Sequence, residues 1–303
     1  MHESVAFEPA GIPVGECLRD SLVAEGDSLQ VLSGEMLPPF SDSPLDMEST
    51  SYPLSDEFDT APNAWFAVNG DMALGYQLAN LTEELSVERI FGPDDRKQVH
   101  ETTRHPFSCL CALDILAPNN QKFVGTGWLI DSQTVVTAGH CVYMKKLGGW
   151  AKAIDVYPGR NGSRVYHRAA AKRLISVRGW TEKRSPPSDY AAIKLTEPLD
   201  EAGTMGFGVM KEDKLRKFRF HVVGYPGDKP RTMWGHVRKL KDVTEDQLIY
   251  ETDTFGGNSG GPVFAVDGGK VWSVGIHNYG DISGNLATRI TKPVYDNFMR
   301  WMG

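Results

Sequence analysis

The chain has 303 residues, of which 41% are hydrophobic, and its 31 glycines and 18 prolines are typical of a turn-rich globular protein. This length provides room for about two domains of ordinary size, each with its own core. Runs of about 18 consecutive apolar residues do not occur, which excludes a membrane-spanning helix, and we expect no membrane partner.

Charge is distributed very unevenly along the chain. The net charge of −7 combines −15 over residues 1–89 with +8 over residues 90–303. An acidic leader therefore precedes a basic body, and the sign of the body favours negatively charged partners. Because the basic residues are scattered and no RNA-binding or helix-turn-helix pattern is present, we expect no nucleic-acid partner.

The acidic leader has the composition of an irregular segment. Residues 1–62 are rich in Ser, Asp, Glu and Pro, so they bury too little apolar surface to offset the entropy of the chain. Residues 64–85 are more apolar and form a candidate docking portion. The amino terminus has neither the basic nor the apolar region of a secretory signal. We expect the leader to be mostly disordered.

Beyond residue 105 the pattern changes to short β-type runs between turn residues, with no alternating helices. About 200 residues of this kind predict an all-β fold of two small barrels in tandem. Residues 292–302 carry apolar side chains at helical spacing and predict a terminal helix packed on the second barrel. The β-type runs cover residues 108–116, 122–130, 134–137, 153–157, 191–195, 218–223, 248–252, 263–266 and 271–276.

The four cysteines, Cys17, Cys109, Cys111 and Cys141, show none of the spacings of a zinc framework, so we expect no metal site. A disulfide between Cys141 and either Cys109 or Cys111 is compatible with an exported protein. Reduced thiols are the alternative, and the spacing does not choose between the two.

The stretch 254–264 (TFGGNSGGPVF) surrounds Ser259 with glycines just before a strand-like run. Such a turn exposes a hydroxyl group and directs backbone N–H groups toward one point, as an acyl-transfer nucleophile requires. A glycine-rich hairpin with an incidental serine is the alternative. The choice depends on whether the chain also provides a base and a carboxylate.

His140 is the strongest candidate for the base, since the stretch 137–141 (TAGHC) places its imidazole at the end of a strand-like run. Asp189 precedes the apolar run 191–195 and is the preferred carboxylate, with Asp155 and Asp131 as weaker candidates. A serine hydroxyl is a weak nucleophile unless a base takes its proton, and the base works best when a carboxylate orients it. We therefore predict a catalytic triad of His140, Asp189 and Ser259.

Together these stretches resemble the chymotrypsin-like serine proteases, whose triad residues occur in the order His, Asp, Ser. From Ile90 to the carboxyl terminus the chain looks like the bacterial-type glutamyl endopeptidases, on segments 223–230 (VGYPGDKP), 233–234, 256–260 and 275–277. The resemblance implies two six-stranded antiparallel barrels with the active site between them. It also implies an oxyanion hole formed by the N–H groups of Gly257 and Ser259, and no cofactor. The chain departs from such relatives at Gly125, where a cysteine partner for Cys141 is usual.

Two sets of residues compete to define the specificity pocket. Asp253, six residues before the serine, occupies the position of the aspartate that selects Arg or Lys in trypsin-like enzymes. His277 and Thr254 match the residues that glutamyl endopeptidases use for a substrate carboxylate, and both side chains donate hydrogen bonds to anions. We predict cleavage after Glu and, more weakly, after Asp. Cleavage after Arg or Lys is the alternative, and an inactive binding protein with a protease fold is a further one.

The join between the acidic leader and the basic body contains Glu88, Arg89 and Ile90. We predict that residues 1–89 form a pro-segment, that opposite charges hold it over the active site as an intramolecular inhibitor, and that a cut after Arg89 releases it. A Glu-selective protease would instead cut after Glu88. The resemblance implies that the freed ammonium of Ile90 lies near the specificity pocket and that the protein is secreted. We expect a monomer that acts on acidic peptide or protein substrates.

Overall fold

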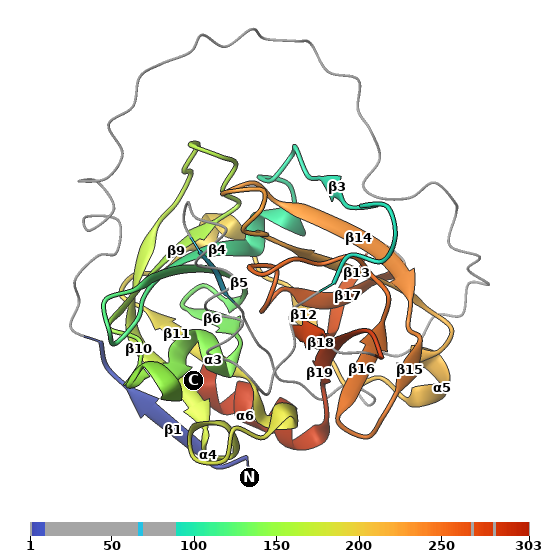
Figure 1. Cartoon of the computed structure of the whole chain (residues 1–303). Coiled ribbons are helices and arrows are strands. Elements are labelled where there is room, and N and C mark those ends of the chain that lie inside the picture. The colour runs from blue at the N-terminus through green and yellow to red at the C-terminus, as the bar shows by residue number, and fades with distance from the viewer. Residues whose placement is uncertain (1, 10–65, 69–88, 268–269, 281–282, 303) are drawn as a thin grey trace, which may run out of the picture.

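The computed structural model describes residues 2–9, 66–68, 89–267, 270–280 and 283–302. Two β-sheets lie side by side, the first mainly green and the second mainly orange in Figure 1. This architecture confirms the prediction of an all-β fold with two tandem units.

The first sheet closes into a barrel. Its neighbours follow the order β10-β11-β6-β5-β4-β9, and β9 pairs again with β10, so these six strands form a ring. Every residue of β4 and β9 is buried, because the strands pack against the interior of the barrel and against covering segments. The first predicted barrel is therefore confirmed. The strands are β4 (Leu110–Leu116), β5 (Lys122–Asp131), β6 (Thr134–Thr137), β9 (Ala153–Pro158), β10 (Ala169–Val177) and β11 (Ala191–Leu195).

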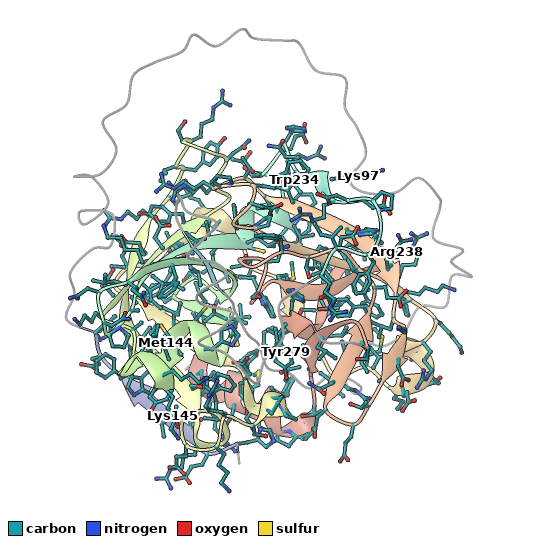
Figure 2. The ribbon with its side chains drawn as sticks, in the orientation of Figure 1. Lys97, Met144, Lys145, Trp234, Arg238 and Tyr279 are labelled. Atoms are coloured by element: carbon teal, nitrogen blue, oxygen red, sulfur yellow. The ribbon has the colours of Figure 1, made fainter. Side chains whose placement is uncertain are left out.

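The second sheet curls into a half-barrel. Its order is β15-β16-β19-β18-β17-β13-β14-β3, and β12 runs parallel to β18. Within the described residues its first and last strands do not pair, so this unit is an open curled sheet. Lys97 on β3 and Trp234 and Arg238 on β14 mark one outer edge (Figure 2). The strands are β3 (Lys97–Gln98), β12 (Gly206–Phe207), β13 (Arg219–Gly224), β14 (Trp234–Lys239), β15 (Asp242–Val243), β16 (Gln247–Tyr250), β17 (Pro262–Asp267), β18 (Lys270–Gly280) and β19 (Asn285–Arg289).

Two short pieces of the acidic leader pair with the first barrel. Strand β1 (Ser4–Phe7) runs antiparallel to β10, and β2 (Phe66–Val68) runs antiparallel to β5. The expectation of irregular chain therefore does not hold for residues 4–7. The remainder of the leader, with the rest of the docking portion 64–85 and with Cys17, lies outside the described residues. The pro-segment stays a prediction.

The predicted terminal helix is present as α6 (Lys292–Met302), and it packs on the second sheet, through Phe207 on β12, and also on the first barrel. The ring of Trp301 lies 5.9 Å from that of Tyr190, and Lys194 on β11 donates a hydrogen bond to the carbonyl of Trp301 (2.9 Å). Phe298 packs at a right angle on Phe207. Figure 1 shows α6 at the bottom of the molecule, near β1 and α4. The apolar side of α6 thus covers the end of the barrel that carries Tyr190.

The remaining elements are single turns and a small ribbon. No helix among the described residues is long and apolar enough to cross a membrane. These elements are α3 (Gly139–Val142), α4 (Arg178–Thr181), α5 (Glu212–Leu215), the 3-10 turns η1 (Phe107–Cys109), η2 (Lys145–Leu147), η3 (Pro186–Ser188) and η4 (Asp200–Ala202), and the ribbon β7 (Tyr143–Met144) with β8 (Gly149–Trp150).

Candidate active site

His140 and Asp189 meet because the strands beside them pair. His140 lies in α3, directly after β6, and Asp189 precedes β11, which pairs with β6. The Nδ1 atom of His140 lies 2.5 Å from Oδ2 of Asp189, and the backbone N–H of His140 donates to Oδ1 (3.0 Å). The carboxylate therefore holds the proton on Nδ1, which makes Nε2 the basic nitrogen. This is the geometry that a general base requires.

Burial controls the ionisation of this pair. It lowers the pKa of His140 well below 6.5, and the positive charge of Arg184 acts in the same direction. Burial raises the pKa of Asp189 well above 3.8, while the backbone N–H of His140 opposes this rise. Trp180 contributes to the burial, since its ring packs edge-on against the imidazole with centroids 5.6 Å apart. The imidazole is therefore neutral at neutral pH and can accept a proton.

Asn278 connects the serine to the aspartate, although sequence reasoning did not single it out. The hydroxyl of Ser259 donates to the Asn278 carbonyl (2.9 Å), and the Asn278 side-chain amide donates to the backbone carbonyl of Asp189 (2.8 Å). The side chains of Ser259 and Asp189 are both fully buried. The three predicted triad residues are thus brought into one region, between the barrel and the half-barrel. The only sequence signal for Asn278 is its position beside His277.

Two peptide groups of the nucleophile loop have a fixed orientation. The carbonyl of Gly256 accepts a hydrogen bond from the N–H of Gly227 (2.7 Å), and the carbonyl of Asn258 accepts one from Gly261 (2.7 Å). In a trans peptide the N–H points opposite to the carbonyl. The N–H groups that follow, those of Gly257 and Ser259, therefore point away from these anchors. This arrangement suits the predicted oxyanion hole.

Glycines make this loop possible. Gly257 and Gly260 have φ angles of +110° and +88°, a region that side chains disfavour. A Cβ atom on Gly261 would lie 2.4 Å from the carbonyl oxygen of Val223 on β13. The glycine-rich pattern around Ser259 thus has a steric cause in the turn and in its close approach to the sheet.

Thr126 on β5 fastens the nucleophile loop to the first barrel. Its hydroxyl donates to the carbonyl of Gly257 (2.6 Å) and accepts from the N–H of Tyr225 (2.9 Å). Its own N–H donates to the carbonyl of Ser259 (3.1 Å). Thr126 is fully buried, so these bonds are protected from water. Sequence reasoning missed this residue because its partners are more than 90 positions away.

The chain is similar to known peptidases. The profile of the trypsin-like peptidase domain matches residues 125–276. A Bacillus subtilis (strain 168) protein named extracellular metalloprotease is 37% identical over 231 residues, which are 74% of this chain and 73% of that protein. The chain belongs to the trypsin-like peptidase family.

Other relatives place the protein among serine endopeptidases. The glutamyl endopeptidase of Bacillus licheniformis is 35% identical over 229 residues, which are 71% of this chain and 70% of the relative. A solved structure of a Glu endopeptidase in complex with MPD superposes with a TM-score of 0.62 at 25% identity, over 71% of this chain and 99% of that one. The trypsin-like peptidase described here is therefore a serine endopeptidase, and the inactive binding protein is set aside.

The residues predicted to read a substrate carboxylate are His277, on β18 of the second sheet, and Thr254, in the loop that follows β16. His277 on β18 is buried, and its Nδ1 atom lies 2.6 Å from the hydroxyl of Tyr250 on β16. Thr254 is also buried, and its hydroxyl has no hydrogen-bond partner among the described residues. A buried hydroxyl without a partner is costly, so this atom is a candidate for contact with a ligand. Tyr250 is a further residue that sequence reasoning missed.

Asp253 does not have the surroundings of a specificity aspartate. One carboxylate oxygen accepts the N–H of Phe91 (2.7 Å) and the other accepts the N–H of Asp95 (2.9 Å). The carboxylate therefore binds the chain that follows the leader. With both oxygens so occupied, it is poorly placed to select a basic substrate side chain, and the geometry weighs against the trypsin-like alternative.

The chain on either side of Ile90 is held beside Thr254. Arg89 donates its N–H to the side chain of Asn285 (3.0 Å), and its carbonyl accepts from the Asn285 amide (2.9 Å) and from the N–H of Thr254 (3.1 Å). Ile90 itself is partly exposed. A few residues later, buried Arg96 binds Asp228 and holds the pKa of Asp94 at about 2. This segment is thus built into the second sheet.

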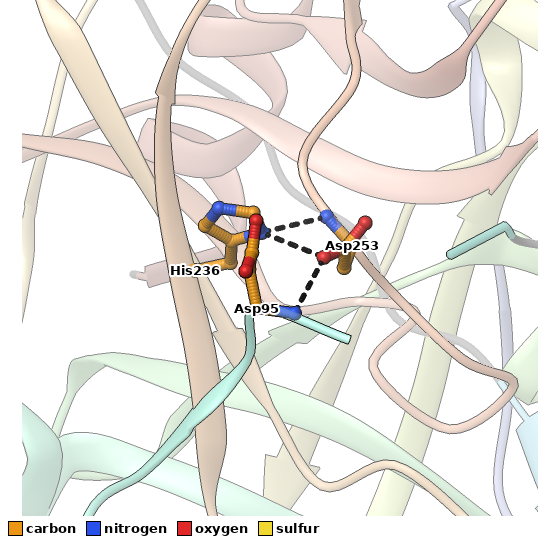
Figure 3. A group of neighbouring side chains, drawn as sticks. All are labelled: Asp95, His236 and Asp253. Atoms are coloured by element: carbon orange, nitrogen blue, oxygen red, sulfur yellow. Dashed lines mark hydrogen bonds and ion pairs between the residues drawn. The ribbon is translucent and has the colours of Figure 1, made fainter. Parts of the chain in front are cut away.

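One group of side chains has the composition of a metal site: Asp95, His236 and Asp253, whose ligand atoms lie within 4.8 Å of one another (Figure 3). Each of them already has a structural partner. The Nδ1 atom of His236 accepts the N–H of Asp253 (3.0 Å), and Asp95 binds Arg238 (3.0 Å). The carboxylate of Asp253 is occupied by backbone N–H groups, as described above. These contacts explain the cluster without an ion.

The other candidates from the sequence have different roles. Asp155 binds Arg168 (3.1 Å), and Asp131 accepts hydrogen bonds within the turn before β6. No disulfide joins the described cysteines, and Cys109, Cys111 and Cys141 are separate buried thiols. Burial raises the pKa of Cys109 to about 12. The structure therefore has the reduced thiols, rather than the disulfide, at these three positions.

Proposed function

We propose that this serine endopeptidase cuts peptide bonds after glutamate, and more weakly after aspartate, through an acyl-enzyme formed on Ser259. The observation that carries the specificity is the carboxylate of Asp253, which accepts the backbone N–H groups of residues 91 and 95, while the buried Thr254 hydroxyl and the His277 ring held by Tyr250 are available as donors. The glutamyl endopeptidases among the relatives support the same specificity.

The proposed reaction follows from the protonation states of the buried pair. His140 takes the proton of the Ser259 hydroxyl through Nε2 as the oxygen attacks the scissile carbonyl. Asp189 stabilises the resulting imidazolium and keeps its orientation, and His140 then gives the proton to the leaving amine. Water then attacks the ester formed on Ser259. His140 takes the proton of this water and afterwards returns a proton to the Ser259 oxygen as the acid product leaves. The hydroxyl of Ser259 donates to Asn278 in this structure, so attack requires it to rotate toward the imidazole.

The oxyanion of each tetrahedral intermediate accepts hydrogen bonds from the N–H groups of Gly257 and Ser259. The anchored carbonyls of Gly256 and Asn258 set the direction of these donors before substrate binds. Donors that need no reorientation during the reaction stabilise the charge most effectively. The contact between Thr126 and the carbonyl of Gly257 holds the same loop from the other barrel.

Substrate selection depends on donors in a buried site. The hydroxyl of Thr254 and Nε2 of His277 donate to the substrate carboxylate, while the hydroxyl of Tyr250 binds Nδ1 and sets the orientation of the ring. An anion in a buried pocket binds strongly only where such donors meet it. An aspartate side chain is shorter by one methylene, which typically costs at least about tenfold in kcat/KM.

The acidic leader is proposed to act as a pro-segment and intramolecular inhibitor of a secreted enzyme. The charges support this role, since a leader of −15 is joined to a body of +8. The name of the Bacillus subtilis relative, extracellular metalloprotease, supports secretion.

The contacts of Arg89 bear on the position of the cut. A cut after Arg89 would remove the residue whose carbonyl binds Thr254 and Asn285. A cut after Glu88 keeps these bonds and turns the N–H of Arg89 into an ammonium beside Asn285. We therefore favour cutting after Glu88, which is the self-processing alternative. Amino-terminal sequencing of the active species distinguishes the two, since Ile90 as first residue would require a second, trypsin-like protease.

The decisive experiment is a peptide panel that varies only the residue before the cut. We expect the order Glu, then Asp, with little cleavage after Gln, Lys or Arg. Preference for Arg or Lys that is lost in Asp253→Ser would establish the trypsin-like alternative. A fluorophosphonate probe should label the processed enzyme and leave Ser259→Ala unlabelled, which tests the nucleophile independently of specificity.

A further inference from the structure

We propose that residues 2–7 are a detachable strand that binds the protease domain by its own contacts, and that this strand stays on the enzyme after the chain between residues 9 and 89 is cut. The occurrence of a natural cut rests on the proposed function. The binding of the strand does not, because it follows from contacts at an edge of the first barrel.

The edge of β10 has room for one more strand. On one side β10 pairs with β11, and on the other it pairs with β9 only at Ala169 and Ala170. Residues 174–177 on that second side pair with β1, in a register that runs from Ser4 opposite Val177 to Phe7 opposite Leu174. The N–H of Arg178 donates to the carbonyl of Glu3 (2.8 Å), which extends the ladder by one residue. Strand addition of this kind is a common mode of peptide binding.

Side chains of α6 and of the loop before β11 hold the start of the strand. The Asn297 amide donates to the carbonyl of His2 (2.9 Å) and to the hydroxyl of Tyr190 (2.8 Å), which also contacts the imidazole of His2 (2.7 Å). Trp301 donates its indole N–H to the hydroxyl of Ser4 (3.0 Å). Segments nearly 300 positions apart in the chain therefore form one polar network.

Both ends of the strand have a further contact. At one end, Glu3 forms an ion pair with Arg178 (3.0 Å), which is consistent with an acidic leader on a basic body. At the other end, the ring of Phe7 stacks on Trp150, with centroids 5.7 Å apart and planes inclined by 8°. The strand thus combines a backbone ladder, a polar network, an ion pair and an aromatic stack.

These contacts predict a two-chain enzyme after processing. A tether raises the effective concentration of a bound segment but makes none of its contacts. Cutting the tether therefore leaves the ladder and the side-chain network in place. Since Tyr190 directly follows Asp189, the retained strand continues to cover the region behind the catalytic carboxylate.

The test uses the full chain with Ser259→Ala, which removes self-cleavage, and with a recognition sequence for an unrelated site-specific protease inserted between Gly34 and Glu35. After cutting at that sequence, size-exclusion chromatography under native conditions at micromolar protein shows whether the fragment that carries β1 elutes with the body. We expect co-elution. Separation of the fragment from a body that stays folded by circular dichroism overturns the proposal.

A pair of proline variants tests the ladder itself. Because the carbonyl of Glu3 bonds to Arg178, alternation along an antiparallel pair assigns the N–H of Val5 to the ladder and directs that of Ala6 outward. Val5→Pro should therefore release the fragment after cutting, and Ala6→Pro should not, since only the first removes a ladder donor. Equal retention in both variants contradicts binding through β1. The engineered cut and the serine variant make these results independent of substrate specificity, so a failed peptide panel would not affect them.

Discussion

Thr126→Val tests whether the link between the first barrel and the half-barrel supports catalysis as well as stability. Valine has nearly the same shape as threonine, so the change removes only the hydroxyl. That hydroxyl donates to the carbonyl of Gly257 at 2.6 Å and accepts from the N–H of Tyr225 at 2.9 Å. Both partners would be left unsatisfied in a fully buried position.

The expected magnitude follows from these two bonds. A buried polar group that loses its partner costs about 1–3 kcal/mol, so the free energy of unfolding should fall by at least about 1 kcal/mol. Removing one oxyanion donor lowers kcat about 10²- to 10³-fold, and here the loop that carries Gly257 is loosened rather than deleted. We therefore expect kcat to fall roughly 10- to 100-fold, with a smaller change in KM.

Two matched variants separate the catalytic effect from the structural one. Thr126→Ser keeps the hydroxyl and should retain most of kcat. Thr137→Val removes a hydroxyl that donates to the backbone carbonyl of Thr126 (3.0 Å), inside the same barrel and away from the nucleophile loop. It should lower the midpoint of urea unfolding with little effect on kcat. If Thr126→Val loses stability but keeps kcat within about twofold, the reasoning that this contact positions the oxyanion donors is refuted.

Four further predictions concern the site. Ser259→Ala should lower kcat by about 10⁴- to 10⁶-fold, and retained activity in a folded, processed variant would show that another residue is the nucleophile. His277→Ala should lower kcat/KM for Glu substrates by about 10²-fold or more, and an equal loss with a Gln substrate would contradict its role toward the carboxylate. Tyr250→Phe should raise KM for Glu substrates about tenfold through a less well oriented His277, whereas an unchanged KM would show that the hydroxyl has no such effect. Burial lowers the pKa of His140, and only the neutral imidazole acts as the base. For a substrate with a neutral side chain before the cut, kcat/KM should therefore fall to half only below pH 6.5. A midpoint above pH 6.5 contradicts the assignment of His140 as the base.

Local sequence patterns were sufficient for the parts of the protein that depend on neighbouring residues. The glycines around Ser259 are required by the turn itself. The segments that form β5, β6 and β11 have the alternating or continuous apolar residues that are typical of strands. The spacing of apolar residues predicted α6 with its observed bounds. In each case the physical cause acts over a few residues, through backbone sterics or the period of a strand or helix.

Strands whose stability comes from their partners were missed. The segment of β10 is rich in alanine and has no clear alternation, yet it pairs with β11, with β9 and with β1. The segment of β19 is polar at both ends, and its pairing with β16 and β18 buries most of it. Such segments become strands because neighbouring strands pair with them, and those strands are distant in the sequence.

Tertiary structure alone decided how the chemically important groups are used. Asp253 and His277 were both candidates for the specificity pocket, and only the fold shows that one binds the backbone after the leader while the other contacts Tyr250. Thr126 had no signal in the sequence and Asn278 only its position beside His277, since the partners of both residues are distant in the chain. Hydrogen bonds between residues far apart depend on how the barrel, the half-barrel and the terminal helix pack. The sequence by itself therefore determined which residues carry reactive groups, and packing determined which of those groups meet.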